Sequence, residues 1–154
     1  MKRRLRAVLV VGMLSALLLG TSASAVLAQS PINREYKLNT KGQADGGGYA
    51  RAVGDLTWYN KHEFAISGKI KDVCPGDGNG ARFGLWIAYR RGEWTWHHLG
   101  SDTDGCDTPG RTFSRSFDRD RRITKVRLFL CENEGGTDTC VGFRMRDKDN
   151  PFTG

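Results

Sequence analysis

The sequence has little of the residue chemistry by which most enzyme active sites are recognised. Its 154 residues include only three histidines, His62, His97 and His98. It lacks both the G-x-S-x-G elbow of serine hydrolases and the H-E-x-x-H pair of helix-borne zinc sites. All four cysteines are expected in disulfides, which leaves no candidate thiol nucleophile. These absences disfavour an enzyme without deciding the point, and we predict no catalytic residue and no cofactor.

Any long helical pattern is also missing after residue 30, which excludes a mainly helical fold. Turn-forming glycine and aspartate recur instead at roughly 8–12-residue spacing, the rhythm of short strands. We predict an all-β fold, a single antiparallel β-sandwich of about seven strands with two disulfides, over residues 49–154. Residues 29–48 are predicted to form an irregular polar lead-in, with a short strand near Tyr36.

The N-terminus has the three parts of a secretory signal. Residues 1–6 carry four positive charges, residues 7–20 are apolar, and residues 21–30 are mostly small. We predict a signal helix over residues 1–28, cleaved after Ala28 or after Ala25, and a secreted, extracellular product without stable membrane association. No cysteine follows the apolar run, which disfavours a lipoprotein anchor. An uncleaved membrane anchor is the alternative.

The basic charge of the chain comes largely from this N-terminal segment. The sequence has 24 Lys and Arg against 17 Asp and Glu, a net charge of +7. Four of the cations and none of the anions lie in residues 1–28, which leaves 20 against 17, or +3, in the rest. Such a mild excess does not favour a nucleic acid partner.

An even number of cysteines in a secreted chain predicts a disulfide framework. A hairpin of residues 124–131 with 140–145 aligns Val126, Leu128 and Leu130 with Met145, Phe143 and Val141. The same alignment sets Cys131 directly opposite Cys140, which predicts that disulfide. Cys74 and Cys106 then pair by elimination.

Two further hairpins follow from aligning apolar faces. Residues 49–59 and 63–73 form the first hairpin. Residues 111–117 are predicted to form a separate, seventh strand, with Phe113 and Phe117 on one face. The expected pairs in the first hairpin are Trp58 with Phe64, Leu56 with Ile66, and Gly54 with Gly68. Residues 82–90 and 93–99 form the second hairpin, around a two-residue turn at Arg91 and Gly92.

The register of the second hairpin decides where its aromatic side chains lie. It places Trp94 and Trp96 in the core, which disfavours an alternative in which they stack on sugar rings. It places Trp86 beside His97 on the outer face, and we take that pair as candidate ligand-binding residues.

The strongest candidate site is the basic side of the Cys131–Cys140 hairpin. In the predicted register Arg127 lies opposite Arg144 and Lys125 opposite Arg146, and like charges placed so destabilise a sheet. An anionic ligand would offset them; the alternative is a solvated face with local ion pairs. The candidate ligand-binding residues are Lys125, Arg127, Phe129, Arg144, Arg146, Trp86 and His97.

Two Asp/Gly segments, residues 77–80 and 102–105, look like fragments of calcium loops. Neither has the complete ligand spacing or the terminal Glu, so we predict no metal site. The alternative is a calcium site shared by the two segments, because the Cys74–Cys106 bridge would bring them together. The arginine-rich signal and the cysteine-bearing hairpin LFLCENEGGTDTCVGF (residues 128–143) resemble the small uncharacterised secreted proteins of actinobacteria. That resemblance implies an extracellular, disulfide-containing β domain.

The function that these observations favour is a non-enzymatic extracellular binding or structural module. Its expected partner is an anionic cell-wall polymer or polysaccharide. One alternative is a small secreted hydrolase, nuclease-like, that uses His97. Another is an inhibitor of a second secreted protein, which the loops around Cys74 and Cys106 would contact. The oligomeric state is not predicted.

Overall fold

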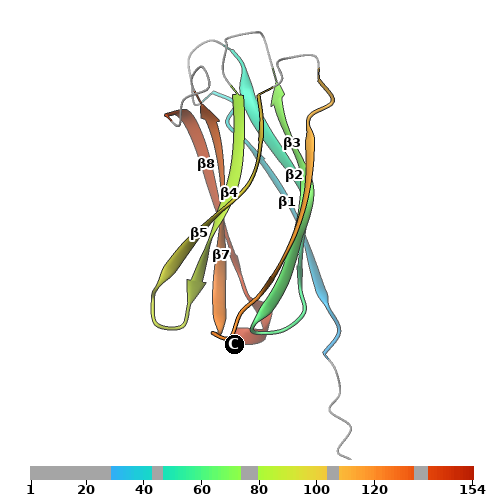
Figure 1. Cartoon of the computed structure of the whole chain (residues 1–154), viewed down its shortest axis with the longest axis vertical. Coiled ribbons are helices and arrows are strands. Elements are labelled where there is room, and N and C mark those ends of the chain that lie inside the picture. Colours follow the sequence, from blue (N-terminus) through green and yellow to red (C-terminus); the bar gives the residue numbers. More distant parts are fainter. Residues whose placement is uncertain (1–28, 43–46, 74–79, 104–107, 134–138) are drawn as a thin grey trace, which may run out of the picture.

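Two four-stranded antiparallel sheets form the molecule, in the orders β1-β2-β3-β6 and β5-β4-β7-β8 (Figure 1). The computed structural model describes residues 29–42, 47–73, 80–103, 108–133 and 139–154. The strands are β1 (Ile32–Asn39), β2 (Tyr49–Trp58), β3 (Glu63–Val73), β4 (Gly80–Tyr89), β5 (Trp94–Asp102), β6 (Arg111–Asp118), β7 (Ile123–Asn133) and β8 (Cys140–Asp149). The predicted all-β, sandwich-like architecture is confirmed, with eight strands in place of about seven.

The added strand is β1, which lies in the segment expected to be irregular. It pairs with β2 over its whole length and forms an edge of its sheet. Its alternation is weak in the sequence because only Tyr36 and Leu38 are buried in the core, whereas the other residues of the strand are polar apart from the half-buried Ile32. The predicted short strand near Tyr36 therefore extends over eight residues.

The β2–β3 hairpin has the register that the sequence predicts. Trp58 pairs with Phe64, and both are fully buried. Gly54 pairs with Gly68, and the missing side chains leave room for the ring of Tyr36, which crosses above them. The Tyr36 hydroxyl donates to the Ser67 carbonyl oxygen at 3.1 Å.

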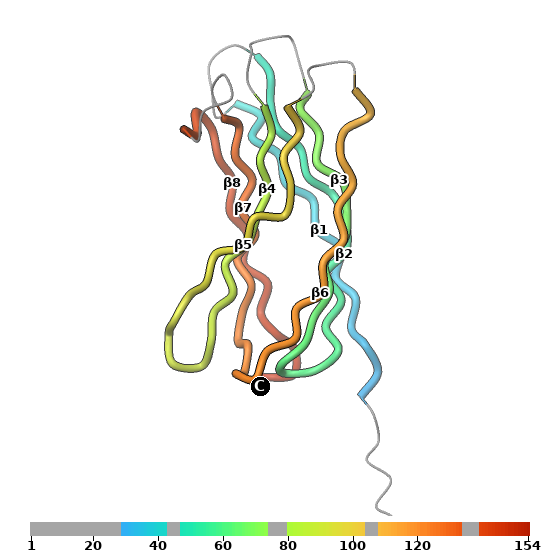
Figure 2. The backbone as a smooth tube through the Cα atoms, in the orientation of Figure 1, coloured from blue at the N-terminus to red at the C-terminus, as the bar shows by residue number. Residues whose placement is uncertain are grey.

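The inner faces of both sheets contribute to one hydrophobic core. Figure 2 shows the two layers, and side chains from each meet between them. Tyr36 of β1 stacks on Phe83 of β4 with ring centres 5.6 Å apart, and Phe113 of β6 packs against Phe83 at 5.3 Å. Strands β4 and β7 lie at the centre of their sheet, and their inward residues are buried along the whole length of each strand.

From Gly84 to Ala88 the β4–β5 hairpin has a register one residue away from the predicted one, and an irregularity between Phe83 and Gly84 restores the predicted register beyond it. The prediction placed a two-residue turn at 91–92, whereas the structure pairs Ala88 with Trp94, which leaves a longer turn. Gly92 adopts φ 84° and its N–H donates to the carbonyl oxygen three residues earlier, as in hairpins with three-residue turns. A shift of one residue moves side chains to the other face. Trp94 and Trp96 therefore lie on the outer face, and their predicted place in the core is wrong.

The β7–β8 hairpin has the predicted disulfide but a different register. Cys131 pairs with Phe143, three residues from the predicted partner Cys140, and Cys140 pairs with Asn133 across an irregularity in the ladder. The Cys131–Cys140 disulfide is confirmed, with Cα atoms 5.6 Å apart. Because the shift is an odd number of residues, it exchanges the two faces of β8 relative to β7.

Some predictions lie outside the described residues. These are the signal segment 1–28 and the Cys74–Cys106 disulfide with its two loops. Over the ranges that the structure does describe, no helix has the length and apolar character needed to cross a membrane.

Candidate functional site

Aromatic side chains gather on the outer face of the β5-β4-β7-β8 sheet. The register of this sheet brings them together from all four strands, because cross-strand partners share a face. We call this surface the aromatic face; its members are Trp86, Trp94, Trp96, Phe129, Phe143 and Met145.

The rings of the aromatic face form a continuous series across the strands. Trp96 of β5 contacts Trp86 of β4 with ring centres 4.5 Å apart. Trp86 contacts Phe129 of β7 at 5.2 Å, and Phe129 contacts Phe143 of β8 at 6.0 Å. The planes are tilted or edge-on to one another, which is the arrangement that aromatic quadrupoles favour. The series is thus held by packing as well as by the backbone.

Small residues below the rings explain why the series fits on a flat sheet. Gly84 lies between His98 and Phe129 in the ladder, and the indole of Trp96 covers it. A Cβ atom at Gly84 would collide with that indole ring. Ala88 has the same position between Trp94 and Lys125.

The two ends of the aromatic face are the most exposed. Trp94 is 43% exposed, Phe143 51% and Met145 48%, whereas Trp86, Trp96 and Phe129 are half-buried beneath and between them. Large apolar side chains that are exposed together, and not singly, mark interaction surfaces on soluble proteins.

An ion-paired network borders the aromatic rings. Arg127 donates from Nε and Nη2 to the two carboxylate oxygens of Asp147, at 2.6 and 2.9 Å. Lys125 approaches Asp147 and Asp149 at 3.4 Å each. The hydrogen bond from Arg127 lowers the pKa of Asp147, and the bonds to carboxylates raise the pKa values of Lys125 and Arg127. Two cations and two carboxylates therefore offset each other on this face.

The structure separates the residues of the predicted basic face. Lys125, Arg127, Phe129 and Trp86 do share the outer face. Arg144 and Arg146 instead pair with Leu130 and Leu128, on the other side of the sheet. The predicted opposition of four cations is therefore wrong, and Lys125 and Arg127 face Asp149 and Asp147, the local ion pairs of the alternative interpretation.

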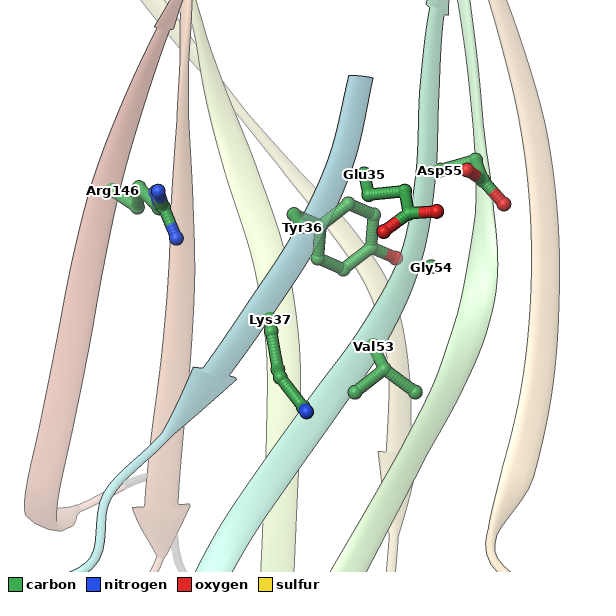
Figure 3. Close-up of a pocket in the computed structure, with 7 residues that line it drawn as sticks. All are labelled: Glu35, Tyr36, Lys37, Val53, Gly54, Asp55 and Arg146. Atoms are coloured by element: carbon green, nitrogen blue, oxygen red, sulfur yellow. The ribbon is translucent and has the colours of Figure 1, made fainter. Parts of the chain in front are cut away.

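Arg146 lies at the edge where β8 meets β1. It lines a shallow depression of about 410 Å³ with six residues of β1 and β2, which Figure 3 shows from close by. Next to it, Lys148 Nζ donates to the Glu35 carbonyl oxygen at 2.9 Å. Burial, and then the charges of Arg146 and Arg34, lower the pKa of Lys148. Lys148 therefore links β8 to β1 of the other sheet.

His97 lies apart from Trp86, on the inner side of β5. Its ring packs edge-on against Phe117 of β6 with centres 5.0 Å apart. Burial, and then the charge of Arg119, lower the pKa of His97. Its Nε2 is buried, and its inward position does not favour the hydrolase alternative.

Metal binding finds no support in the described residues. Within them, no three His, Cys, Asp or Glu side chains are grouped closely enough to hold an ion. Asp102, at the start of one predicted calcium-loop fragment, is fully buried, and its Oδ2 accepts from the Asp72 N–H at 2.9 Å. The rest of both fragments, apart from Gly80 and Thr103, lies outside the described residues.

Sequence reasoning missed four members of the aromatic face: Trp94, Trp96, Phe143 and Met145. Each was assigned to the wrong side by a register error. A signal was present for the first two, because a single glycine at position 92 suits the left-handed last residue of a three-residue turn.

Comparison with family models, curated proteins and solved structures gave no match for this chain. The function is therefore inferred from its own residues.

Proposed function

We propose that this chain is a non-enzymatic, exported module that binds an uncharged polysaccharide on the aromatic face. The observation that carries the proposal is the series of rings across four strands, with Phe143 exposed at its β8 end and Trp94 exposed on β5. The C–H faces of sugar rings are apolar, and an aromatic surface removes them from water.

The polar groups beside the rings suit the hydroxyl groups of a sugar. Binding sites combine an apolar surface with a few fixed polar groups that orient the ligand. Arg127 and Asp147 hold each other in place and retain exposed polar atoms, since their side chains are 39% and 34% exposed. Such a pair offers both donors and acceptors to hydroxyl groups.

Charge on this face favours an uncharged ligand over the anionic one that the sequence predicts. Lys125 and Arg127 are each bound to carboxylates, so the face has no excess of positive charge to attract an anion. An acidic polymer would have to displace Asp147 from Arg127.

The test is binding of the purified protein to insoluble cellulose and chitin and to soluble dextran and xylan. We expect retention by at least one of them, unchanged from about 50 mM to about 500 mM NaCl, because no net charge is involved. Trp94→Ala and Phe143→Ala should each weaken binding about ten-fold, since each removes an exposed ring.

Tyr59→Ala is the matched control, because Tyr59 is 37% exposed but lies outside the aromatic face. Its binding should equal that of the wild type, and thermal unfolding should show all three variants folded. Failure of the wild type to bind any of the four glycans, or full binding by both ring variants, would contradict the proposal.

A further inference from the structure

The outer face of the other sheet, β1-β2-β3-β6, carries a cluster of positive charge. We call it the basic face; its members are Lys37, Arg51, Lys69 and Lys71. Arg51 of β2 lies directly opposite Lys71 of β3. In the next outward row, Val53 lies between Lys37 of β1 and Lys69 of β3. Four cations thus occupy two adjacent rows on three strands.

Nothing on the described part of the chain neutralises these four charges. None of them has an ion pair or a side-chain hydrogen bond to a described residue. The nearest carboxylates on the same face belong to Glu35 and Asp55. These two residues lie opposite each other in the next row of the sheet, beyond Lys37 and Lys69. Like charges directly opposite destabilise a sheet, so the Arg51–Lys71 pair has an energetic cost that no ion pair with a described residue offsets.

A shallow groove runs through the basic face. It encloses about 440 Å³ and is lined by Arg51, Val53, Lys69, Lys71 and Pro109. Gly110 follows at φ 81°, where a Cβ would lie 3.0 Å from the Cβ of Lys71 and 2.6 Å from a backbone oxygen. Glycine at this position therefore lets the start of β6 close one wall of the groove.

We propose that the basic face binds a linear anionic glycan, one that carries carboxylate, sulfate or phosphate groups along its chain. Several fixed charges that meet a polyanion gain affinity together through counterion release. Single-stranded nucleic acids are held on several stacked aromatic rings. On this face a single described aromatic residue, Tyr49, lies next to the four cations, which favours a glycan over a nucleic acid. The site lies on the opposite side of the molecule from the aromatic face (Figure 2), so it does not rest on the proposed function.

The test compares dextran sulfate with dextran, which share a backbone and differ in charge. We expect the wild type to bind dextran sulfate and not to bind dextran through this face. Affinity should fall about 100-fold or more between about 50 mM and about 500 mM NaCl. The double variant Arg51→Gln/Lys71→Gln should bind at least ten-fold more weakly, and Lys61→Gln, an exposed lysine in the β2–β3 turn, should not differ from the wild type.

The same experiment separates this site from the aromatic face. Trp94→Ala should bind dextran sulfate as the wild type does, whatever its effect on uncharged glycans. Equal binding of dextran sulfate by the double variant and the wild type overturns the proposal, as does tighter binding of a single-stranded DNA of matched charge.

A second variant keeps the proposal testable through stability. Arg51→Glu converts the like-charge pair with Lys71 into an opposite-charge pair. It should raise the Tm by about 2 °C while it removes binding to dextran sulfate. A cation retained only for folding would give a lower Tm on substitution, and that result counts against a ligand site.

Discussion

The guanidinium carbon of Arg127 lies 4.8 Å from the centre of the Trp94 ring. The two residues come from different strands that are not neighbours, and Ala88 of the intervening strand is small enough for the contact to form above it. Because Asp147 holds the other side of the guanidinium with two hydrogen bonds, the cation is fixed over the indole. The most exposed tryptophan of the aromatic face is therefore oriented by an ion pair two strands away.

The stabilising effect of this ion pair should depend on pH. Arg127 lowers the pKa of Asp147 in the folded protein, so the folded state binds fewer protons than the unfolded chain in acid. The stability that the pair supplies is therefore present above about pH 4 and is lost as the pH falls through the folded pKa. We expect Asp147→Asn to lower the Tm by about 2 °C at pH 7 and to have a progressively smaller effect as the pH falls below about 4. Asp149→Asn, at a carboxylate that is 80% exposed, is the control with little effect at either pH.

Gly84→Ala should disturb the aromatic face from below. The added methyl group would meet the Trp96 indole and the His97 carbonyl oxygen, so the ring must move. We expect a loss of about 1–3 kcal/mol in the free energy of unfolding and a changed tryptophan emission spectrum. Gly100→Ala, in the neighbouring strand β5, is the matched control, because its Cβ would meet only Ile70 at 3.9 Å. Similar losses in both variants would show that the effect is general to glycines of the β4–β5 hairpin.

Stability at high pH should report on Tyr36. Burial, and then the negative charge of Asp55, raise the pKa of this phenol well above its ordinary value. The unfolded chain ionises there near pH 10 while the folded protein keeps its proton, so stability falls as the pH rises above about 10. Tyr36→Phe removes the ionisation and the hydrogen bond to Ser67, which costs about 1 kcal/mol at neutral pH. We therefore expect its Tm to decline less steeply than that of the wild type between pH 9 and pH 11.

The Cys131–Cys140 disulfide should contribute most of its effect through the unfolded chain. It closes a loop across nine residues of sequence separation. Loop-closure entropy predicts that Cys131→Ala/Cys140→Ser lowers the free energy of unfolding by about 2–3 kcal/mol. Urea unfolding of the variant without reductant provides the measurement. A loss below about 0.5 kcal/mol would show that the ladder between β7 and β8 already restrains these ends.

The parts of the fold that could be predicted are those where two independent patterns agree. In β2–β3, apolar alternation and the opposed Gly54 and Gly68 require the same register, and the structure has it. In β4–β5 the tryptophans occupy alternate positions that either register satisfies, so the turn length alone decided the outcome. Strand β1 was underestimated because an edge strand with two inward residues carries little apolar signal.

The candidate sites could be predicted only where the strand register could. The predicted basic hairpin depended on the β7–β8 register, which the irregularity between Glu132 and Asn133 alters. The opposed pair Arg51 and Lys71 could have been predicted, because it follows from the correctly predicted β2–β3 register. Lys37 could not be added from sequence, since its row exists only once β1 is known to pair with β2.

The connection at positions 90–92 decides which side chains of β5 are displayed. If the same residues closed a two-residue turn at Arg91 and Gly92, Trp86 would pair with His97, so Thr95 and His97 would point outward in place of Trp94 and Trp96. The identity of the displayed surface is thus encoded in how a solvent-exposed connector closes and not only in the strand that bears it. In such an architecture a recognition surface can arise or vanish through a change confined to the turn, with no substitution among the residues that compose it.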